Sequence, residues 1–552
     1  MSWSVEKTAD LKIKPPVAIY QDLIKEPITS VVHMPVTMPR DMEQARQSRG
    51  SPLLETLASG SQSSPSGRLR YGRREDEPPL ENGWLPYLGL AFQFGSNPLE
   101  FLRSRQKKYG DAVTCKIAGS YFTFILDPFS YGAVFRNGKN LDFQKFAIET
   151  SRKVFGHADF TDPKYNLTYE ELHHIFRQTL QGPALYPLTS NMMENLQFVM
   201  LRSKTSAWTT EGLYSFTFRI MFEAGYLTLF GKDEKALRDD TERFEAHKVL
   251  IHKAMNDFKV FDKAFPLIVA GLPIGIIRGV KAAREALAER LQHKYLKKNS
   301  SLSALTEQRM RFFDPVPHLD ELDKARTHNV MLWASQANTL PATFWSLYYM
   351  LRSPEAMQAA KNEVENMLQE TNQKSGDTEK PVSFSKDQLD NMPVTNSIIS
   401  EALRLSSASI MIRIATENFT LTLDSGSKIA IRKGDRVALY PQMVHLDSDI
   451  YEDPEEFKFN RFLDENGQKK TTFYKNGRKF KSYLMPFGSG ISECPGRFFA
   501  VNEIKQFLAL VLCYYDMELQ GDEALPLDNF RAGLGILQPK QDVLFTYKLK
   551  NT

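Results

Sequence analysis

One segment near the C-terminal end limits the possible folds of this chain more than any other. In MPFGSGISECPGRFFAVNEIKQFLALVL (485–512), Phe487 and Gly490 stand in a loop of small residues, and Cys494 and a Pro-Gly pair follow. Beyond the loop, apolar residues recur at the spacing of one helix face, at Val501, Ile504, Leu508 and Leu512. The segment therefore predicts a thiol held at the start of a buried helix.

The setting of Cys494 is typical of a metal ligand. Free N–H groups and the positive end of a helix dipole favour a thiolate, and glycines let N–H groups come close to its sulfur. No second cysteine or histidine stands nearby at metal-binding spacing, so Cys494 fits the single axial ligand of a haem iron, a bond that favours O–O cleavage. The alternative is a small buried hydrophobic residue, which is the role predicted for Cys115 and Cys513 because they lack this setting.

The loop resembles the F-x-x-G-x-[RH]-x-C-x-G signature of the cytochrome P-450 monooxygenases. Ser492 stands where the family has Arg or His, so one expected contact to a haem propionate is missing. The resemblance implies a mainly α (α+β) fold, with a helix-rich domain and a small β-sheet region. It also implies haem b as cofactor, with Cys494 as the axial thiolate and with Phe487 and Gly490 beside the porphyrin.

Glu401 and Arg404 form an E-x-x-R motif on a predicted helix, where this spacing places both side chains on one face. Such a motif is usually a surface pair, but the apolar helix around it predicts burial, and a buried pair needs further hydrogen bonds. The family resemblance implies that Arg461 completes a network that fixes the loop before Cys494. It also implies that Arg413 binds a haem propionate; an ordinary cation at a strand edge is the alternative.

Residues 326–352 predict one long, largely apolar and therefore buried helix. Asn338 and Pro341 weaken its middle, and the proline frees a backbone carbonyl, so we expect a local opening that could admit water or oxygen. The family pattern A-G-x-[DE]-T fits in two registers, with Ala337 and Asn338, or Asn338 and Thr339, in the acid and alcohol positions. Asn338 and Thr339 are therefore the candidate catalytic residues beside Cys494; a kinked core helix without a catalytic role is the alternative.

Further segments narrow the resemblance within the family, among them EPPLENGWLPYLG (77–89), LWASQANTLPATFWSL (332–347) and RAGLGIL (531–537). They are similar to the branch that hydroxylates cholesterol at the 7α position, the first step of bile-acid synthesis. The resemblance implies a reaction with molecular oxygen and with electrons from NADPH, delivered by the flavoprotein NADPH-cytochrome P-450 reductase. Alternatives are a related sterol hydroxylase (12α or oxysterol 7α), a prostacyclin-synthase-like isomerase that needs no reductase, and a sterol binder without activity.

A sterol is bulky, rigid and apolar, and small or aliphatic side chains suit such a ligand. The family resemblance indicates which segments face the substrate, and their side chains have this character. The predicted substrate-binding residues are Trp333, Ala334, Ala337, Ala408, Ser409, Ile410 and Ile536. Without the resemblance, they would simply be core residues.

Residues 1–76 show no sustained periodicity and predict a poorly ordered extension and linker, followed by a haem-thiolate domain over 77–552. No stretch reaches the ~18–20 apolar residues that span a bilayer. The resemblance nevertheless implies an endoplasmic reticulum membrane with a cytosolic catalytic domain, and the apolar run 264–277 is a candidate contact with the lipid bilayer; a buried loop is the alternative.

Charge says little about other macromolecular partners. A net charge of +4 gives no field strong enough to argue for nucleic acid, and none is expected as a partner. A basic run before the cysteine loop is a candidate docking surface for an acidic reductase, and a solvated loop is the alternative: Lys469, Lys470, Lys475, Arg478, Lys479 and Lys481.

Overall fold

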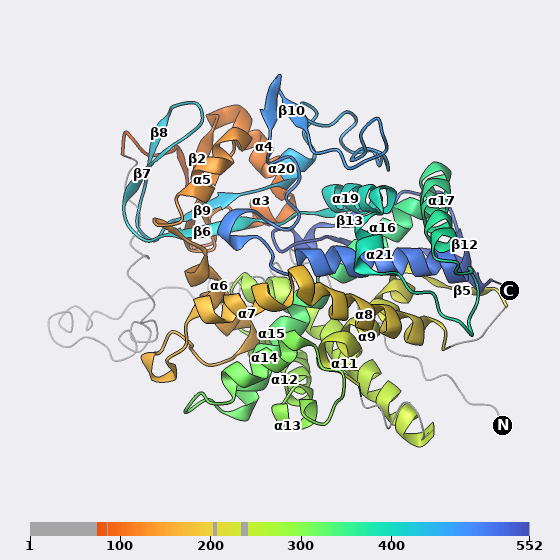
Figure 1. The fold of residues 1–552 in the computed structure, drawn as a ribbon. Coiled ribbons are helices and arrows are strands. Elements are labelled where there is room, and N and C mark those ends of the chain that lie inside the picture. The colour runs from red at the N-terminus through yellow and green to blue at the C-terminus, as the bar shows by residue number, and fades with distance from the viewer. Residues whose placement is uncertain (1–73, 85–86, 203–206, 233–240, 551–552) are drawn as a thin grey trace, which may run out of the picture.

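Helices dominate the computed structural model, which describes residues 74–84, 87–202, 207–232 and 241–550 (Figure 1). The helix-rich α+β class predicted from the sequence is confirmed. Nearly all of the extension predicted for residues 1–76 lies outside the described residues. The domain predicted for 77–552 contains all of the elements that follow, and its boundaries stay a prediction.

A six-stranded sheet lies at one side of the molecule (Figure 1), with the strand order β1-β2-β3-β9-β6-β4. The sequence of residues 113–127 predicts two strands joined by a short Gly-Ser turn, and the structure confirms them as the antiparallel hairpin β2 (Ala112–Ile117) and β3 (Ser120–Ile125). Strand β6 (Met411–Ala415) pairs with β9 (Arg436–Leu439) and sets Arg413 in its middle. The outer strands are β1 (Leu80–Glu81) and β4 (Leu141–Asp142).

Two helical segments show how local sequence sets the ends of helices. Asn97 followed by Pro98 predicts a helix start, with the helix over about 97–109. The structure has α4 (Pro98–Tyr109) there, and the Asn97 side chain accepts a hydrogen bond from the Glu100 N–H at 3.2 Å. The helix predicted around Glu401 and Arg404 spans about 386–405 by its sequence pattern, but the structure has two helices there, α18 (Lys386–Asp390) and α19 (Pro393–Ser406), because a proline disfavours helical backbone in the residue before it.

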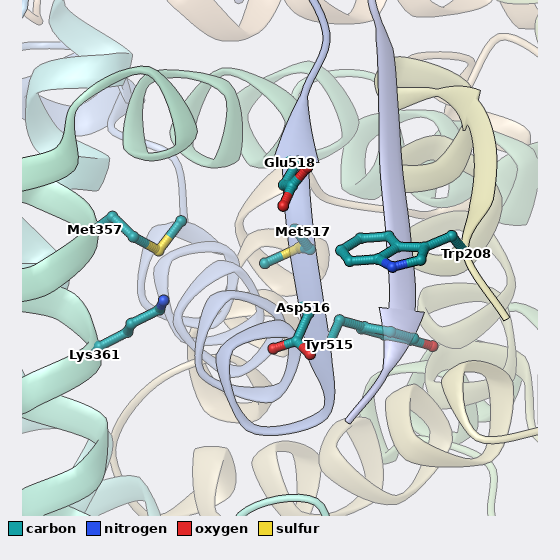
Figure 2. Close-up of a pocket in the computed structure, with 7 residues that line it drawn as sticks. All are labelled: Trp208, Met357, Lys361, Tyr515, Asp516, Met517 and Glu518. Carbon is teal, nitrogen blue, oxygen red and sulfur yellow. The ribbon is translucent and has the colours of Figure 1, made fainter. Parts of the chain in front are cut away.

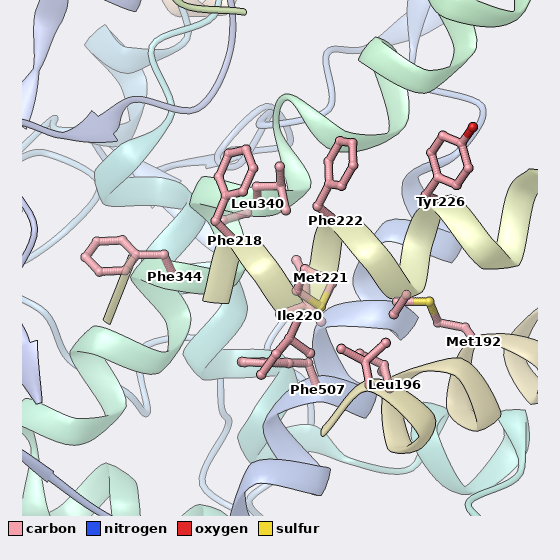
Figure 3. Close-up of a cluster of buried hydrophobic side chains, with 14 of the residues drawn as sticks. Met192, Leu196, Phe218, Ile220, Met221, Phe222, Tyr226, Leu340, Phe344 and Phe507 are labelled. Atoms are coloured by element: carbon pink, nitrogen blue, oxygen red, sulfur yellow. The ribbon is translucent and has the colours of Figure 1, made fainter. Parts of the chain in front are cut away.

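The main core forms where α8 (Leu185–Met200), α9 (Leu213–Phe230) and α21 (Arg497–Tyr514) meet α16 (Thr339–Arg352). Figure 3 shows Leu196, Ile220 and Phe507 meeting there from three different helices. Helix α21 crosses the middle of the molecule (Figure 1) and is buried on nearly all sides. The buried helix predicted after Cys494 is therefore confirmed, and neighbouring elements also cover the faces of this helix beyond the apolar one named from the sequence.

The single helix predicted over 326–352 is in fact two helices, α15 (Glu321–Gln336) and α16 (Thr339–Arg352). Asn338 stands between them with φ −104° and ψ −34°. The interruption lies one turn before Pro341, as expected for a residue that has no N–H to donate to the preceding turn. We call the junction at Ala337 and Asn338 the helix break.

The apolar run 264–277 divides between two environments. Its first part completes α11 (Thr241–Val269), where Ala264 and Phe265 are buried, and its second part is a loop with a short 3-10 turn at Ile274–Ile276. Exposed residues begin at Ala270 and Ile276 is 65% exposed, so the second part of the run is accessible to a lipid surface. Among the described residues, no helix has the length and apolar character needed to cross a membrane.

Candidate active site

The cysteine loop has the geometry that its glycines require. Gly488 and Gly490 adopt φ values of +75° and +67°, in the left-handed region that side chains disfavour. The Cys494 N–H donates to the Phe487 carbonyl at 2.9 Å and closes the loop three residues before α21 begins at Arg497. The structure thus brings Phe487, Gly490 and Cys494 into one loop at a helix start, as the sequence predicted.

Two opposing influences act on the Cys494 thiol. Burial is the larger and raises the pKa of the thiol, whereas hydrogen bonds from the backbone N–H groups of Gly496 and Arg497 lower it. The predicted stabilisation of a thiolate by N–H groups is present, but burial outweighs it. An anionic sulfur at this position therefore needs the additional positive charge of a bound metal ion. Cys115 and Cys513 are fully buried packing residues, and burial raises the pKa of each thiol to about 12.

Arg413 is a buried cation beside the cysteine loop. Its side chain is only 4% exposed, and its guanidinium donates to the Ile412 carbonyl at 3.0 Å and to the Ser492 hydroxyl. Within the described part of the chain it forms no ion pair with a carboxylate, and burial lowers its pKa to about 10. Because a buried cation without an anion is costly, this site fits an anionic group such as a haem propionate. Ser492, in the place of the family's Arg or His, holds this arginine.

The E-x-x-R motif forms the predicted buried network. Arg404 donates to both Glu401 carboxylate oxygens, at 2.7 and 2.8 Å, and both side chains are 0% exposed. Arg461 donates to the same carboxylate at 2.8 Å. Arg404 also donates to the carbonyls of His445 and Pro454, each at 2.6 Å. The hydrogen bonds that a buried pair needs are therefore present.

His445 extends this network to the cysteine loop, and no sequence pattern pointed to this role. Its carbonyl accepts from Arg404, and its ring Nε2 accepts from the Met485 N–H at 2.9 Å, at the start of the 485–496 loop. The ring must be neutral to accept that hydrogen bond. Complete burial and the neighbouring Arg404 lower its pKa to about 3.

We predict that His445 makes the folded protein sensitive to acid. The folded state takes up no proton at His445 until about pH 3, whereas an unfolded histidine does so near pH 6.5. Unfolding therefore binds a proton in this window, and stability falls as the pH drops from about 6.5 towards 3. His445→Gln keeps an acceptor without a titrating group, so the free energy of unfolding, measured by urea denaturation between pH 7 and 4.5, should depend less steeply on pH. Equal slopes in the two proteins would contradict the assignment of this pH dependence to His445. The other histidines are present in both proteins, so their contributions to the slopes cancel.

At the helix break, the two candidate catalytic side chains both have partners. The Asn338 Oδ1 accepts from the Ile536 N–H at 3.1 Å, and the Thr339 hydroxyl donates to the Glu503 carboxyl at 3.0 Å. Glu503 lies in α21, nine residues after Cys494, and its burial raises its pKa to about 8. The hydroxyl of Thr339 is thus turned towards a carboxyl group that is protonated at neutral pH. The catalytic roles of Asn338 and Thr339 stay predictions.

The carbonyl that Pro341 was expected to leave open has a donor. Arg531 Nη2 donates to the Ala337 carbonyl at 3.2 Å. The expected opening for water or oxygen at this carbonyl is therefore filled by a side chain from the C-terminal loop.

Two of the three segments that carry the predicted substrate-binding residues pair directly. The segment with Ala408, Ser409 and Ile410 pairs with residues 533–537: the Ala408 N–H donates to the Gly535 carbonyl at 2.9 Å, and the Ile410 N–H donates to the Gly533 carbonyl at 3.2 Å. Ile536 forms an isolated bridge with Ser407 in this pairing. Ala337, Ala408 and Ile536 are buried in packed surroundings, whereas Ala334 is exposed. Contact with a sterol stays a prediction for all of them.

Of two hollows in the described part of the chain, one touches the cysteine loop. A groove of about 550 Å³ runs between that loop and α7 (Tyr169–Thr179), and its lining includes Ile491, Glu493, Arg497, His173 and Arg177. The other, of about 320 Å³, lies among Trp208, Lys361 and Asp516 (Figure 2). It sits at the far end of the 18-residue helix α21, about 27 Å from the cysteine end at 1.5 Å per residue, so it belongs to no part of this site.

Comparison with known proteins agrees with this geometry. The family model described as Cytochrome P450 matches residues 78–545. The cholesterol 7-alpha-monooxygenase of Cricetulus griseus is 52% identical over 489 residues, covering 87% of this chain and 95% of that protein. The cytochrome P450 7A1 of Oryctolagus cuniculus is 52% identical over 483 residues, with the same coverage. The 7-alpha-hydroxycholest-4-en-3-one 12-alpha-hydroxylase of Homo sapiens is 37% identical over 502 residues, covering 88% and 95%.

Proposed function

The chain belongs to the cytochrome P450 family, and from this premise we propose that it hydroxylates cholesterol at the 7α position. The observation that carries the proposal is the glycine-turned loop that presents the Cys494 sulfur, in a chain about half identical to cholesterol 7-alpha-monooxygenases along nearly their whole length. In this reaction one oxygen atom of O2 enters the C–H bond, and two electrons from NADPH with two protons reduce the other to water. The product opens bile-acid synthesis from sterol.

The residues of the cysteine loop and of strand β6 would hold the cofactor. When bound, a haem with a thiolate ligand supplies the activation of molecular oxygen. Cys494 would give the sulfur ligand, with the N–H groups of Gly496 and Arg497 directed at it, and Arg413 would pair with a propionate. Phe487 and Gly490, in the same loop as Cys494, would also contact the cofactor. The chain's contribution is to fix these groups and to keep bulk water from the sulfur.

The helix break and the C-terminal loop would form the substrate side. Trp333 and Ala334 precede the helix break on α15. The paired segments 406–410 and 533–537 would bring small and aliphatic side chains to the Asn338 end of the break. A rigid sterol loses little conformational entropy when it binds against such side chains. Hydroxylation at one position needs only that the sterol bind in one orientation. Thr339 and the protonated Glu503 hold exchangeable protons beside the break.

A flavoprotein reductase is the proposed electron donor, and the groove at the cysteine loop is its proposed docking area. Ile491 and Arg177 line the groove, and Ile491 is exposed there; Phe498, which follows Arg497 of the groove lining, is exposed as well. The basic run contributes less than its sequence suggests, because Lys475 is already paired with Asp447 and Asp449, at 2.7 and 2.8 Å. Its exposed lysines would steer an acidic partner by long-range attraction: Lys469, Lys470, Lys479 and Lys481.

We also propose that the protein acts at the endoplasmic reticulum membrane, with its catalytic domain on the cytosolic side. A sterol substrate is dissolved in lipid, so the enzyme must meet the bilayer to receive it. The loop around Ile276, with Lys263 and Arg278 at either end of the run, offers an apolar tip between cations, a composition suited to the lipid interface.

A reconstituted assay tests the proposed function. Purified protein loaded with haem is incubated with cholesterol, NADPH and reductase, and products are identified by mass spectrometry against 7α- and 12α-hydroxylated standards. We expect 7α-hydroxycholesterol, formed only when NADPH and reductase are both present. Turnover of a peroxide substrate without electrons would point to an isomerase, and a substrate-induced spin shift without product would point to a sterol binder; either result would contradict the proposal.

A further inference from the structure

Pro341 leaves one carbonyl of the helix break without its normal donor. In a regular helix the N–H of residue 341 would donate to the carbonyl of residue 337, but proline has no N–H. Arg531, from the C-terminal loop, supplies the donor instead, with its Nη2 at 3.2 Å from the Ala337 carbonyl oxygen. Ala337 is buried, so a carbonyl left without this partner would be costly.

The same guanidinium also binds a carboxylate of α11. Arg531 Nη1 donates to Asp262 Oδ1 at 2.6 Å, and the two side chains are 4% and 5% exposed. Asp262 accepts two further hydrogen bonds, from the Trp333 indole N–H at 2.8 Å and from the Gln538 amide at 3.0 Å. Phe265, one turn further along α11, stacks on Trp333 at 3.7 Å between ring centroids. Helix α11 is therefore connected to α15 directly and to the helix break through one arginine.

A second contact ties the same loop to the break. The Asn338 Oδ1 accepts from the Ile536 N–H, and the preceding Gly535 makes room for it. Gly535 has φ +148°, and a Cβ atom there would lie 2.0 Å from that oxygen. The C-terminal loop thus fixes both residues of the break, Ala337 through a side chain and Asn338 through the backbone.

We propose that Arg531 is a positioning residue for the hydroxylation, which holds the helix break in one geometry and couples it to α11. It acts through Ala337 and Asp262 and does not itself touch the substrate. The inference rests on the proposed function, because Asn338 of the helix break and the next residue, Thr339, are the candidate catalytic residues, and Ala337 of the break is a predicted substrate-binding residue. A displacement of about 1 Å at such a place can cost on the order of 100-fold in rate.

Pro341→Ala gives the proposal a specific test, because alanine returns the missing N–H to the helix. We expect Arg531→Met to lower the product formed per NADPH by about 10- to 100-fold, with haem content and the carbon monoxide spectrum kept. The doubly substituted Asp262→Asn/Arg531→Met protein, which buries no unpaired charge, should show the same loss and guards against misfolding of the single variant. Adding Pro341→Ala to either should recover most of the lost product.

Hydrogen–deuterium exchange supplies a readout that needs no substrate. Amides of α11 should exchange faster in Arg531→Met and stay fast when Pro341→Ala is added, since that change restores the helix donor but not the link to Asp262. The matched control is Arg290→Met, which removes another ion pair of α11, that of Arg290 with Asp257 at 2.7 Å. It should speed exchange in α11 without loss of product.

Three results would overturn the proposal: wild-type product yield in both Arg531 variants, no recovery with Pro341→Ala, or the same loss in Arg290→Met. Failure of the proposed function would look different, because the unaltered protein would then give no 7α product while the exchange experiment still reported on Arg531.

Discussion

Replacing Cys494 by serine is expected to abolish turnover and to remove the absorbance band that marks thiolate-ligated haem in the reduced carbon monoxide complex. Removing groups that merely support a metal ligand typically costs 10- to 100-fold in affinity or activity, so loss of the ligand itself should cost more than about 100-fold. A serine hydroxyl stays neutral at physiological pH and gives the iron far less electron density than a thiolate does. The measurement is the difference spectrum together with product formation from cholesterol.

The other two cysteines provide the control for this prediction. Cys115→Ala and Cys513→Ala each remove a buried thiol that lies outside the cysteine loop. Both should keep the spectral band and the activity, with at most a modest loss of stability from the small cavities that they create. If Cys494→Ser retained the band, or if either control lost it, the assignment of the iron ligand would be wrong.

The second large effect is expected on folding. Glu401→Gln removes the anion that Arg404 and Arg461 share, and Arg404 is 0% exposed, so its charge would stay buried without compensation. Breaking a buried pair in this way costs about 3–5 kcal/mol, a large part of the roughly 5–15 kcal/mol that stabilises a native protein. We expect a corresponding fall in the free energy of unfolding by urea, together with poor haem retention, because His445 links this network to the cysteine loop.

An exposed ion pair supplies the comparison for Glu401→Gln. Glu307 and Arg311 lie 3.6 Å apart with side chains 48% and 79% exposed, so Glu307→Gln makes the same chemical change in solvent. Its cost should stay below about 1 kcal/mol. Similar costs at the two positions would show that the buried network does not hold the fold. Full haem retention in Glu401→Gln would separate the network from the cysteine loop.

Parts of the candidate site could be predicted because their signals are local in the sequence. The spacing of Phe487, Gly490 and Cys494 lies within eight residues, and Glu401 and Arg404 occupy one helix face whatever surrounds them. Helix starts such as that at Asn97 follow from the hydrogen bond between a side chain and the backbone three residues later.

The tertiary structure alone decided how these local pieces are joined. No periodicity pairs Arg531 with Asp262, 269 residues away, or directs the Met485 N–H to His445. The sequence by itself determined that a thiol would stand at a helix start and that Pro341 would deprive one carbonyl of its donor. Only the packed fold decided that Arg531 would satisfy that carbonyl and that burial would outweigh the N–H groups around the Cys494 sulfur, because desolvation and long-range hydrogen bonds depend on which distant segments meet.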